Sequence, residues 1–322
     1  MATVFKNLLS NDVATTRTLL NEAIPITGTI VSGTYNDENI KDYAHGMFQS
    51  VYDYPYLSSS ANHIFDLTYG YSSDLSSSLN TQNAKKLNVY NQMAQVLVGY
   101  DTNGAVRKFD RDGDLTSGDK LDACVFINYS RLLTKDEVKK GSFRLTLSGS
   151  SGHKTIGDYN GVNGYKVNSP AGEYGVLYTA SAAVPGTGVG LIYYQAGVAV
   201  LTASSDIVTL AEDFTGSYTI SGSADQVRKC WDDNDFNNTT ELNSTIYFCR
   251  LSNNEFNYSS NPTYLSGSKI VTKNVSSDPS VSYITSIGLY SADNELLAVA
   301  KLSEPLKKDQ NNELTLRVRL DY

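Results

Sequence analysis

The segment Leu314-Thr-Leu-Arg-Val-Arg-Leu-Asp-Tyr322 alternates between apolar and polar side chains along most of its length. This alternation is typical of a β-strand that has one buried face and one face in water. It predicts that four apolar side chains point inward: Leu314, Leu316, Val318 and Leu320. Arg317 and Arg319 would then point outward, where they could meet an acidic neighbour or water.

Residues 241–322 contain further short segments of the same kind, separated by turn-forming residues. Strands are expected at 244–251, 268–273, 281–290, 295–302 and 313–320. Ala292-Asp293-Asn294 supplies a tight turn, so it predicts a hairpin whose two strands share one sheet with the last strand. The spacing of the strands favours an antiparallel sandwich or a small barrel.

The middle of the sequence, residues 116–240, is also rich in β-type patterns. They predict strands at 121–129 and 142–147, and a hairpin at 190–202 that turns near 195–197. Glycine and serine interrupt the apolar runs between 148 and 190 so often that we expect an inserted lobe with long loops. Ser223 can cap a brief helix at 224–231, and a solvated loop is expected after it.

The first 115 residues contain most of the helix signal. Capping residues and the spacing of apolar side chains predict three helices, at 12–23, 36–52 and 82–98. Phe48 belongs to the apolar stripe of the second helix, which we expect in a core or under a neighbouring subunit. The alternation at 64–71 predicts a half-buried strand.

Together these patterns predict an α+β fold that is mainly β. A helix-containing N-terminal region, residues 1–115, is followed by antiparallel β-sandwich-like regions. These are a β-rich middle domain at 116–240 with the glycine- and serine-rich lobe, and a C-terminal antiparallel β domain at 241–322.

Composition limits the kinds of partner that the chain can have. With 34 acidic and 26 basic side chains the net charge is −8, so nucleic acid is not expected as a primary ligand. No stretch approaches the ~20 apolar residues of a transmembrane helix, and residues 1–12 lack the pattern of a signal peptide. We therefore expect a soluble protein that is not exported by a signal peptide and has no membrane partner.

The three cysteines, Cys124, Cys230 and Cys249, are an odd number at wide spacing. They do not suggest a disulfide framework, although a single Cys230–Cys249 bridge is compatible with the sequence. Free thiols in a reducing compartment are the expectation.

Motifs of catalysis and cofactor binding are not found in the sequence, so neither an enzyme nor a cofactor is expected. The loop Asp110-Arg-Asp-Gly-Asp-Leu-Thr-Ser-Gly-Asp119 has alternating carboxylates that could converge on Ca²⁺. Its glycine is at the fourth position instead of the sixth, and Leu121 stands where a calcium loop needs a glutamate. We expect an acidic surface loop and no metal that the fold requires.

Aromatic side chains are the candidates for contacts. The chain has 23 tyrosines, which suit both protein interfaces and the faces of sheets. Trp231, beside Asp232, Asp233 and Asp235, could stack on a sugar ring, or it could lie at the end of a helix before a solvated loop. The candidate interface residues are Phe48, Tyr54, Tyr56, Trp231, Tyr258, Tyr264, Arg317 and Arg319.

Two stretches near the C-terminus resemble known proteins: Glu255-Phe-Asn-Tyr-Ser-Ser-Asn-Pro-Thr-Tyr-Leu265 and residues 281–308, which include Ile287-Gly-Leu-Tyr290 and Glu295-Leu-Leu-Ala-Val-Ala-Lys301. They resemble virion structural proteins of contractile-tailed marine and cyanobacterial bacteriophages. The strand pair also looks like attachment domains at the start of phage tail-fibre proteins, which dock onto the baseplate. The resemblance covers roughly the last seventy residues. Residues 47–62 are similar in character to the same group.

This resemblance implies a structural subunit of a myovirus-type virion that is assembled in the cytoplasm of the bacterial host. The baseplate is the first expectation and the neck or collar the second. Other virion structural proteins, and copies of the chain itself in a ring, are the implied partners. The alternatives are a host-glycan-binding adhesin module, a capsid decoration protein and a glycan-degrading enzyme of the particle.

Overall fold

The computed structural model describes residues 5–31, 35–43, 47–74, 81–149, 152–179, 187–203, 224–259, 264–267, 269–270, 277 and 279–322. Strands account for 50% of the structure and helices for 14%, which confirms the expected α+β, mainly β class. The chain divides into two compact units. Unit 1 comprises residues 1–18 and 241–322, and unit 2 comprises residues 19–240.

Unit 2 is built on an eight-stranded antiparallel sheet. In spatial order its strands are β2 (Ile40–Tyr43), β3 (Phe48–Tyr52), β4 (His63–Tyr71), β5 (Ala123–Tyr129), β12 (Val198–Thr202), β11 (Gly190–Tyr193), β10 (Gly172–Leu177) and β9 (Lys166–Ser169). The hairpin expected at 190–202 is β11–β12, and the strands expected at 64–71 and 121–129 are β4 and β5.

The central strands of this sheet are buried on both faces. In β5, Val125 and Ile127 pack in one apolar cluster while Cys124 and Phe126 pack in another. Because alternate side chains of a strand point to opposite faces, the two clusters lie on the two sides of the sheet. This explains why the sequence of β5 is an almost continuous apolar run.

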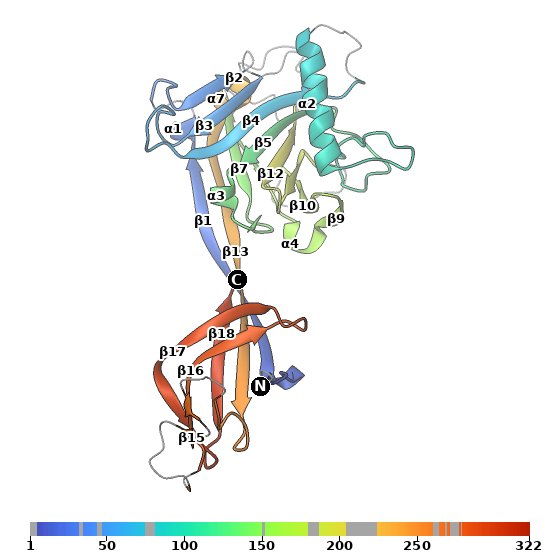
Figure 1. Cartoon of the computed structure of the whole chain (residues 1–322). Coiled ribbons are helices and arrows are strands. Elements are labelled where there is room, and N and C mark those ends of the chain that lie inside the picture. The colour runs from blue at the N-terminus through green and yellow to red at the C-terminus, as the bar shows by residue number, and fades with distance from the viewer. Residues whose placement is uncertain are drawn as a thin grey trace. The chain divides into compact units, whose positions relative to one another are not determined.

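One layer covers each face of the eight-stranded sheet. The helix α2 (Thr81–Leu97) packs against β4 (Figure 1), and its Tyr90, Ala94 and Leu97 belong to the second cluster. The first cluster is completed by side chains of a second sheet, whose strands include β6 (Glu137–Val138), β7 (Arg144–Gly149), β8 (Gly152–Gly157), β1 (Val13–Thr27) and β13 (Trp231–Leu251). The short helices are α1 (Gly28–Val31), α3 (Arg131–Thr134), α4 (Gly161–Gly164) and α7 (Ala224–Lys229).

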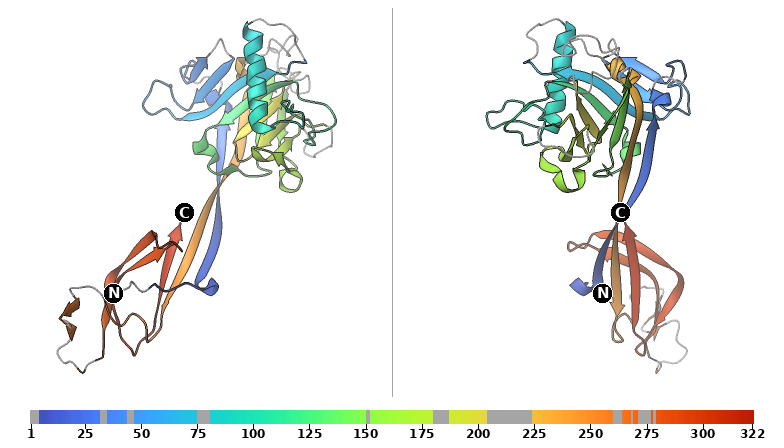
Figure 2. Two further views of the ribbon diagram at one scale, coloured as in Figure 1. Left: turned by 45° about the vertical axis from the view of Figure 1, so that its right-hand side comes forward. Right: turned by 180° about the vertical axis from the view of Figure 1, so that it is seen from behind.

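Unit 1 contains residues 241–251 of β13 and the C-terminal strands (Figure 2). Strand β18 (Leu314–Asp321) pairs with β13 from Leu251↔Leu314 to Ser244↔Asp321. Strands β16 (Ser282–Tyr290) and β17 (Leu296–Lys308) form a separate hairpin, and β14 (Leu265–Ser266) pairs with β15 (Lys269–Ile270). A short 3₁₀ turn, η1 (Ser10–Asp12), precedes β1.

The alternation in the last strand is confirmed. Leu314, Leu316 and Leu320 are half-buried and Val318 is buried, while the arginines between them are exposed. The hairpin through residues 292–294 is also confirmed. Its strands do not share a sheet with β18, however, because β18 pairs with β13.

Two of the three predicted helices are wrong. Residues 13–27 form β1, since pairing with β13 outweighs the weak helix propensity of this segment. The second predicted helix, at 36–52, does not form. Its first residues Asn36 (φ 54°) and Asp37 (φ 63°) adopt the left-handed backbone conformation, and a hairpin of β2 and β3 follows. Only the helix predicted at 82–98 is confirmed, as α2.

The middle region departs from expectation at two places. Residues 148–190 are not an inserted lobe, because β8, β9 and β10 within them are members of the two main sheets. No solvated loop follows the brief helix α7, because Trp231 begins the 21-residue strand β13. The proposed cap Ser223 and part of the strand expected at 268–273 lie outside the described residues.

Candidate functional site

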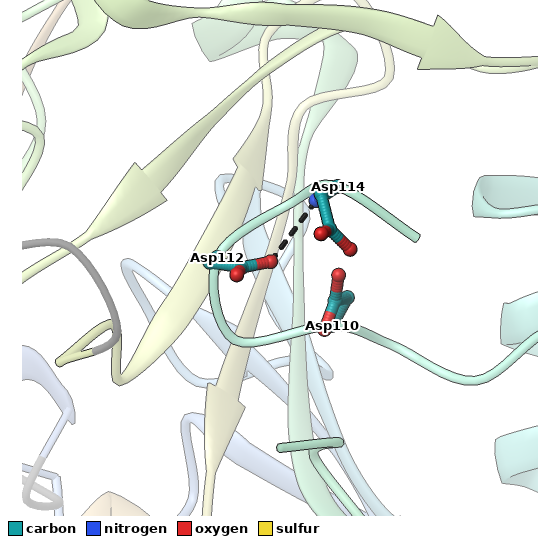
Figure 3. A group of neighbouring side chains, drawn as sticks. All are labelled: Asp110, Asp112 and Asp114. Atoms are coloured by element: carbon teal, nitrogen blue, oxygen red, sulfur yellow. Dashed lines mark hydrogen bonds between the residues drawn. The ribbon is translucent and has the colours of Figure 1, made fainter. Parts of the chain in front are cut away.

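The acidic loop brings three carboxylates together. Asp110, Asp112 and Asp114 point toward one another, with one oxygen of each within 4.8 Å of the others (Figure 3). Among the described residues, no other group of three or more His, Cys, Asp or Glu side chains lies close enough together to hold a metal ion. Positive φ angles at Gly113 and Leu115 turn the backbone around these acids.

Partners from the protein already bind these carboxylates. The Lys120 ammonium donates to Asp110 Oδ1 at 3.0 Å and to the Ser117 carbonyl oxygen at 2.9 Å. Burial raises the pKa of Asp110, an effect that Lys120 opposes. Hydrogen bonds from the hydroxyl and backbone N–H of Ser117 hold the pKa of Asp114 well below its usual range. The loop is thus closed by its own groups, and the prediction that the fold requires no metal remains to be tested.

Three of the predicted contact residues gather at the β2–β3 end of unit 2. The Tyr54 ring lies 5.3 Å from the ring of Tyr35, and the Tyr56 ring lies 6.3 Å from that of Tyr52. Lys41 Nζ connects the group, at 4.9 Å from the Tyr43 ring centroid and 5.9 Å from that of Tyr56. We call these five side chains the tyrosine cluster: Tyr35, Tyr43, Tyr52, Tyr54 and Tyr56.

Phe48 adjoins this cluster. Its ring is half-buried and lies 5.4 Å from that of Tyr43, its cross-strand partner in the β2–β3 hairpin. Tyr43, Tyr54 and Tyr56 are exposed. An exposed aromatic group beside a cation is a surface suited to contact with another molecule.

Trp231 is placed quite differently. Its side chain is only 3% exposed and stacks on Phe65 with ring centroids 4.7 Å apart. Because both rings belong to the core of unit 2, the indole face is not open to a sugar ring. The neighbouring Asp233 and Asp235 lie in β13, paired with β7.

Unit 1 contains an open groove that is lined mainly by apolar side chains. The groove has a volume of about 710 Å³ and lies among β13, β18, the β16–β17 hairpin and residues 5–8. We call it the apolar groove; its lining includes Tyr247, Cys249, Ile284, Leu289, Leu316 and Leu320. Asp12 and Arg250, paired at 2.7 Å between Oδ1 and Nε, line its polar side.

In the part of unit 1 that the structure describes, the groove corresponds to an interior that is not closed. Among the described residues of unit 1, Val318 is the only buried hydrophobic side chain. The other buried side chains there are polar: Asp12, Ser244, Thr245, Asn257, Ser282 and Lys308. Leu297, which lines the groove, is still 68% exposed, and Val299 of the same strand is 56% exposed.

The remaining predicted contact residues also belong to unit 1. Tyr258 is exposed and lies edge-on to the half-buried Tyr264, with centroids 5.7 Å apart. Arg319 is bound by Asp321, at 2.7 Å between Nε and Oδ1, and by the Ser244 hydroxyl. Arg317 is exposed on the same face of β18. None of these four side chains lines the groove.

The sequence patterns identified the strands beside the groove but not the groove itself. The inward positions of β18 were visible as an alternation of apolar side chains, and β16 was expected as a strand. Alternation shows which face avoids water, but it does not show whether enough chain exists to cover that face.

Comparison with protein-family models, with curated proteins and with solved structures found no match for this chain. Among the described residues, no helix is both long and apolar enough to span a membrane.

Proposed function

We propose that the chain is a structural subunit of a tailed-phage virion that acts through contacts with neighbouring subunits. Within the tail machine, the baseplate is the first candidate and the neck or collar the second. The proposal joins the resemblance of residues 255–308 to virion proteins with one observation, the unclosed interior of unit 1. The chain would be found in the virion, with other virion proteins and copies of itself as partners.

The described part of unit 1 leaves apolar area uncovered. Burying apolar surface contributes ~25 cal/mol per Å², so a folded unit that leaves its inward side chains in water loses most of its main source of stability. Large apolar patches on soluble proteins mark sites of contact, and permanent interfaces resemble a domain core cut in half. A subunit that is completed only in an assembly fits this description.

The test is incorporation into particles. Virions of the phage that encodes the chain should contain it, as detected by mass spectrometry of purified particles. A Leu289→Asp variant, altered in the groove, should be absent from particles, because an unpaired carboxylate would be buried in the contact.

The matched control is Thr285→Asp on the exposed face of the same strand, which should be incorporated. Purified virions that lack the wild-type chain would contradict the structural role.

A second candidate function is favoured by the tyrosine cluster. Exposed tyrosine rings can stack on sugars, so a glycan-binding module would use this surface instead of Trp231. A glycan array probed with the wild-type chain and with a Tyr54→Ala/Tyr56→Ala double variant tests it. Binding that the double variant loses would support the adhesin role, and absence of binding would remove it.

A further inference from the structure

The apolar groove of unit 1 is open to solvent. Its lining comes from β13, β18, the β16–β17 hairpin and residues 5–8, and the inward apolar side chains of β16 and β18 that line it stay half-exposed. Unit 2, by contrast, buries its own apolar side chains in two clusters. Within the part of unit 1 that the structure describes, nothing further covers the groove, so it is open to an occupant that presents apolar side chains.

Charge indicates which occupant is favoured. Unit 1 has ten acidic and ten basic side chains, whereas unit 2 has 24 acidic and 16 basic ones. The whole net charge of −8 is therefore in unit 2. A neutral surface gives no electrostatic preference for a strongly acidic or basic partner, but it lets two identical surfaces meet without net repulsion.

The arrangement of these charges is also compatible with self-contact. Exposed groups of both signs lie on unit 1: cations such as Lys301 and Arg317, and acids such as Asp293 and Glu304. In a two-fold contact each copy offers the same patch, so a patch that has both signs at different places can pair with itself.

Strand edges supply a further reason. Among the described residues, β16 and β17 pair only with each other, and a two-stranded sheet is marginally stable by itself. The free backbone groups along such a hairpin form a template for another strand. An identical edge from a second copy, antiparallel across a two-fold axis, would provide that strand.

We propose that the apolar groove of unit 1 is closed by unit 1 of a second copy of this chain. The inward side chains of the two copies would then form one shared core, and unit 1 would be complete only in the homomer. The inference rests on the proposed structural role, because it assigns the partner of that same surface.

The test uses the full chain and sedimentation equilibrium over a wide range of concentration. The wild-type chain should self-associate. Leu316→Asp should weaken this association by about 100-fold or more, because the carboxylate would be buried unpaired in the shared core. Thr315→Asp, one residue away on the exposed face of β18, should associate like the wild type.

A second readout needs no variant, and so it holds even if Leu316→Asp fails to fold. Cys249 lines the groove, while Cys124 and Cys230 are buried in unit 2. Alkylation of Cys249 by a maleimide should therefore slow by about tenfold or more as the concentration passes through the association range.

A wild-type chain that stays monomeric, with Cys249 reacting at one rate throughout, would overturn the inference. Self-association that Leu316→Asp leaves unchanged would do the same. A monomeric chain that is still incorporated into virions would overturn the homomeric contact but not the structural role. A chain that self-associates through the groove but is absent from virions would support the homomeric contact and overturn the structural role.

Discussion

The two units of this chain have similar strand patterns but bury their apolar side chains to different extents. In unit 2 the eight-stranded sheet is covered on both faces, and residues such as Leu67 and Phe126 are fully buried. In unit 1 the same alternation leaves the inward side chains around an open groove, with Val318 alone buried among the described hydrophobic residues.

The two units therefore differ in whether their described residues form a closed apolar core. Unit 2 has what a domain needs to be stable, namely two apolar clusters with little contact with water. Unit 1 has paired strands and a buried polar network but, among its described residues, no comparable core. It follows that changes in unit 2 should act on stability, and changes in unit 1 should act mainly on association.

The largest effect is expected from deleting residues 314–322. The deletion removes β18 and leaves the β13 segment 244–251 as an unpaired edge, so aggregation or loss of incorporation is expected. Unit 2 should stay folded. Trp231, the only tryptophan, reports this by its fluorescence because it stacks on Phe65 in the core of unit 2. A truncated chain that remains monomeric and still enters particles would refute this role of β18.

A pair of matched substitutions compares the interiors of the two units. Leu67→Ala removes a fully buried side chain of unit 2 and should lower the free energy of unfolding by ~2–5 kcal/mol. Leu297→Ala, at a 68% exposed position of unit 1, should change it by less than ~0.5 kcal/mol in the diluted chain. Urea unfolding followed by circular dichroism measures both. Equal costs would mean that unit 1 has a closed core after all.

The polar interior of unit 1 can be tested at Lys308. Its buried ammonium donates to Asn257 Oδ1 at 2.7 Å and to the carbonyl oxygens of Asn253 and Asp309. Lys308→Met would leave these acceptors unpaired, at a cost of ~1–3 kcal/mol. The exposed Lys307→Met is the control. Faster amide exchange at 253–257 in Lys308→Met alone is expected, and no difference between the two variants would exclude a stabilising role.

The smallest effect is a pH dependence at Asp158 in unit 2. Burial raises the pKa of this carboxyl, although Gly141 N–H and the Tyr194 hydroxyl donate to its Oδ2. A raised folded-state pKa means that the native state loses stability as pH rises from the ordinary aspartate range through that pKa. Asp158→Asn lacks this titration. Urea titration at a series of pH values gives the free energy of unfolding of both proteins. The value for Asp158→Asn minus the value for the wild type should rise between about pH 3 and pH 7. A difference that stays constant with pH would contradict a raised pKa at Asp158.

The sequence predicted those elements whose local pattern agrees with their environment. The stripe of α2, the hairpin at 190–202 and the alternation of β18 are examples. It failed where pairing between distant segments decides the conformation. Residues 36–52 place apolar side chains at helical spacing, but Tyr43 and Phe48 are cross-strand neighbours. The Asp- and Asn-rich start of β13 resembles a loop, but it is a strand because neighbouring strands such as β7 pair with it.

For the candidate surface, the sequence identified residues but not their setting. Tyr54 and Tyr56 were expected to be contacts and lie in an exposed cluster, whereas Trp231 is buried. The apolar groove could not be predicted, because it depends on how much chain remains to cover β16 and β18. Whether a unit has enough chain to cover its apolar faces is a property of the whole unit and not of any one segment.

The central claim is that unit 1 is completed by a neighbouring subunit while unit 2 is complete in itself. Hydrogen–deuterium exchange of the chain, first diluted and then assembled, tests this claim most directly. We predict that amides of β16, β17 and β18 become markedly more protected on assembly, while those of β5 and β12 are equally slow in both states. Equal protection of β16–β18 in the two states would contradict the account.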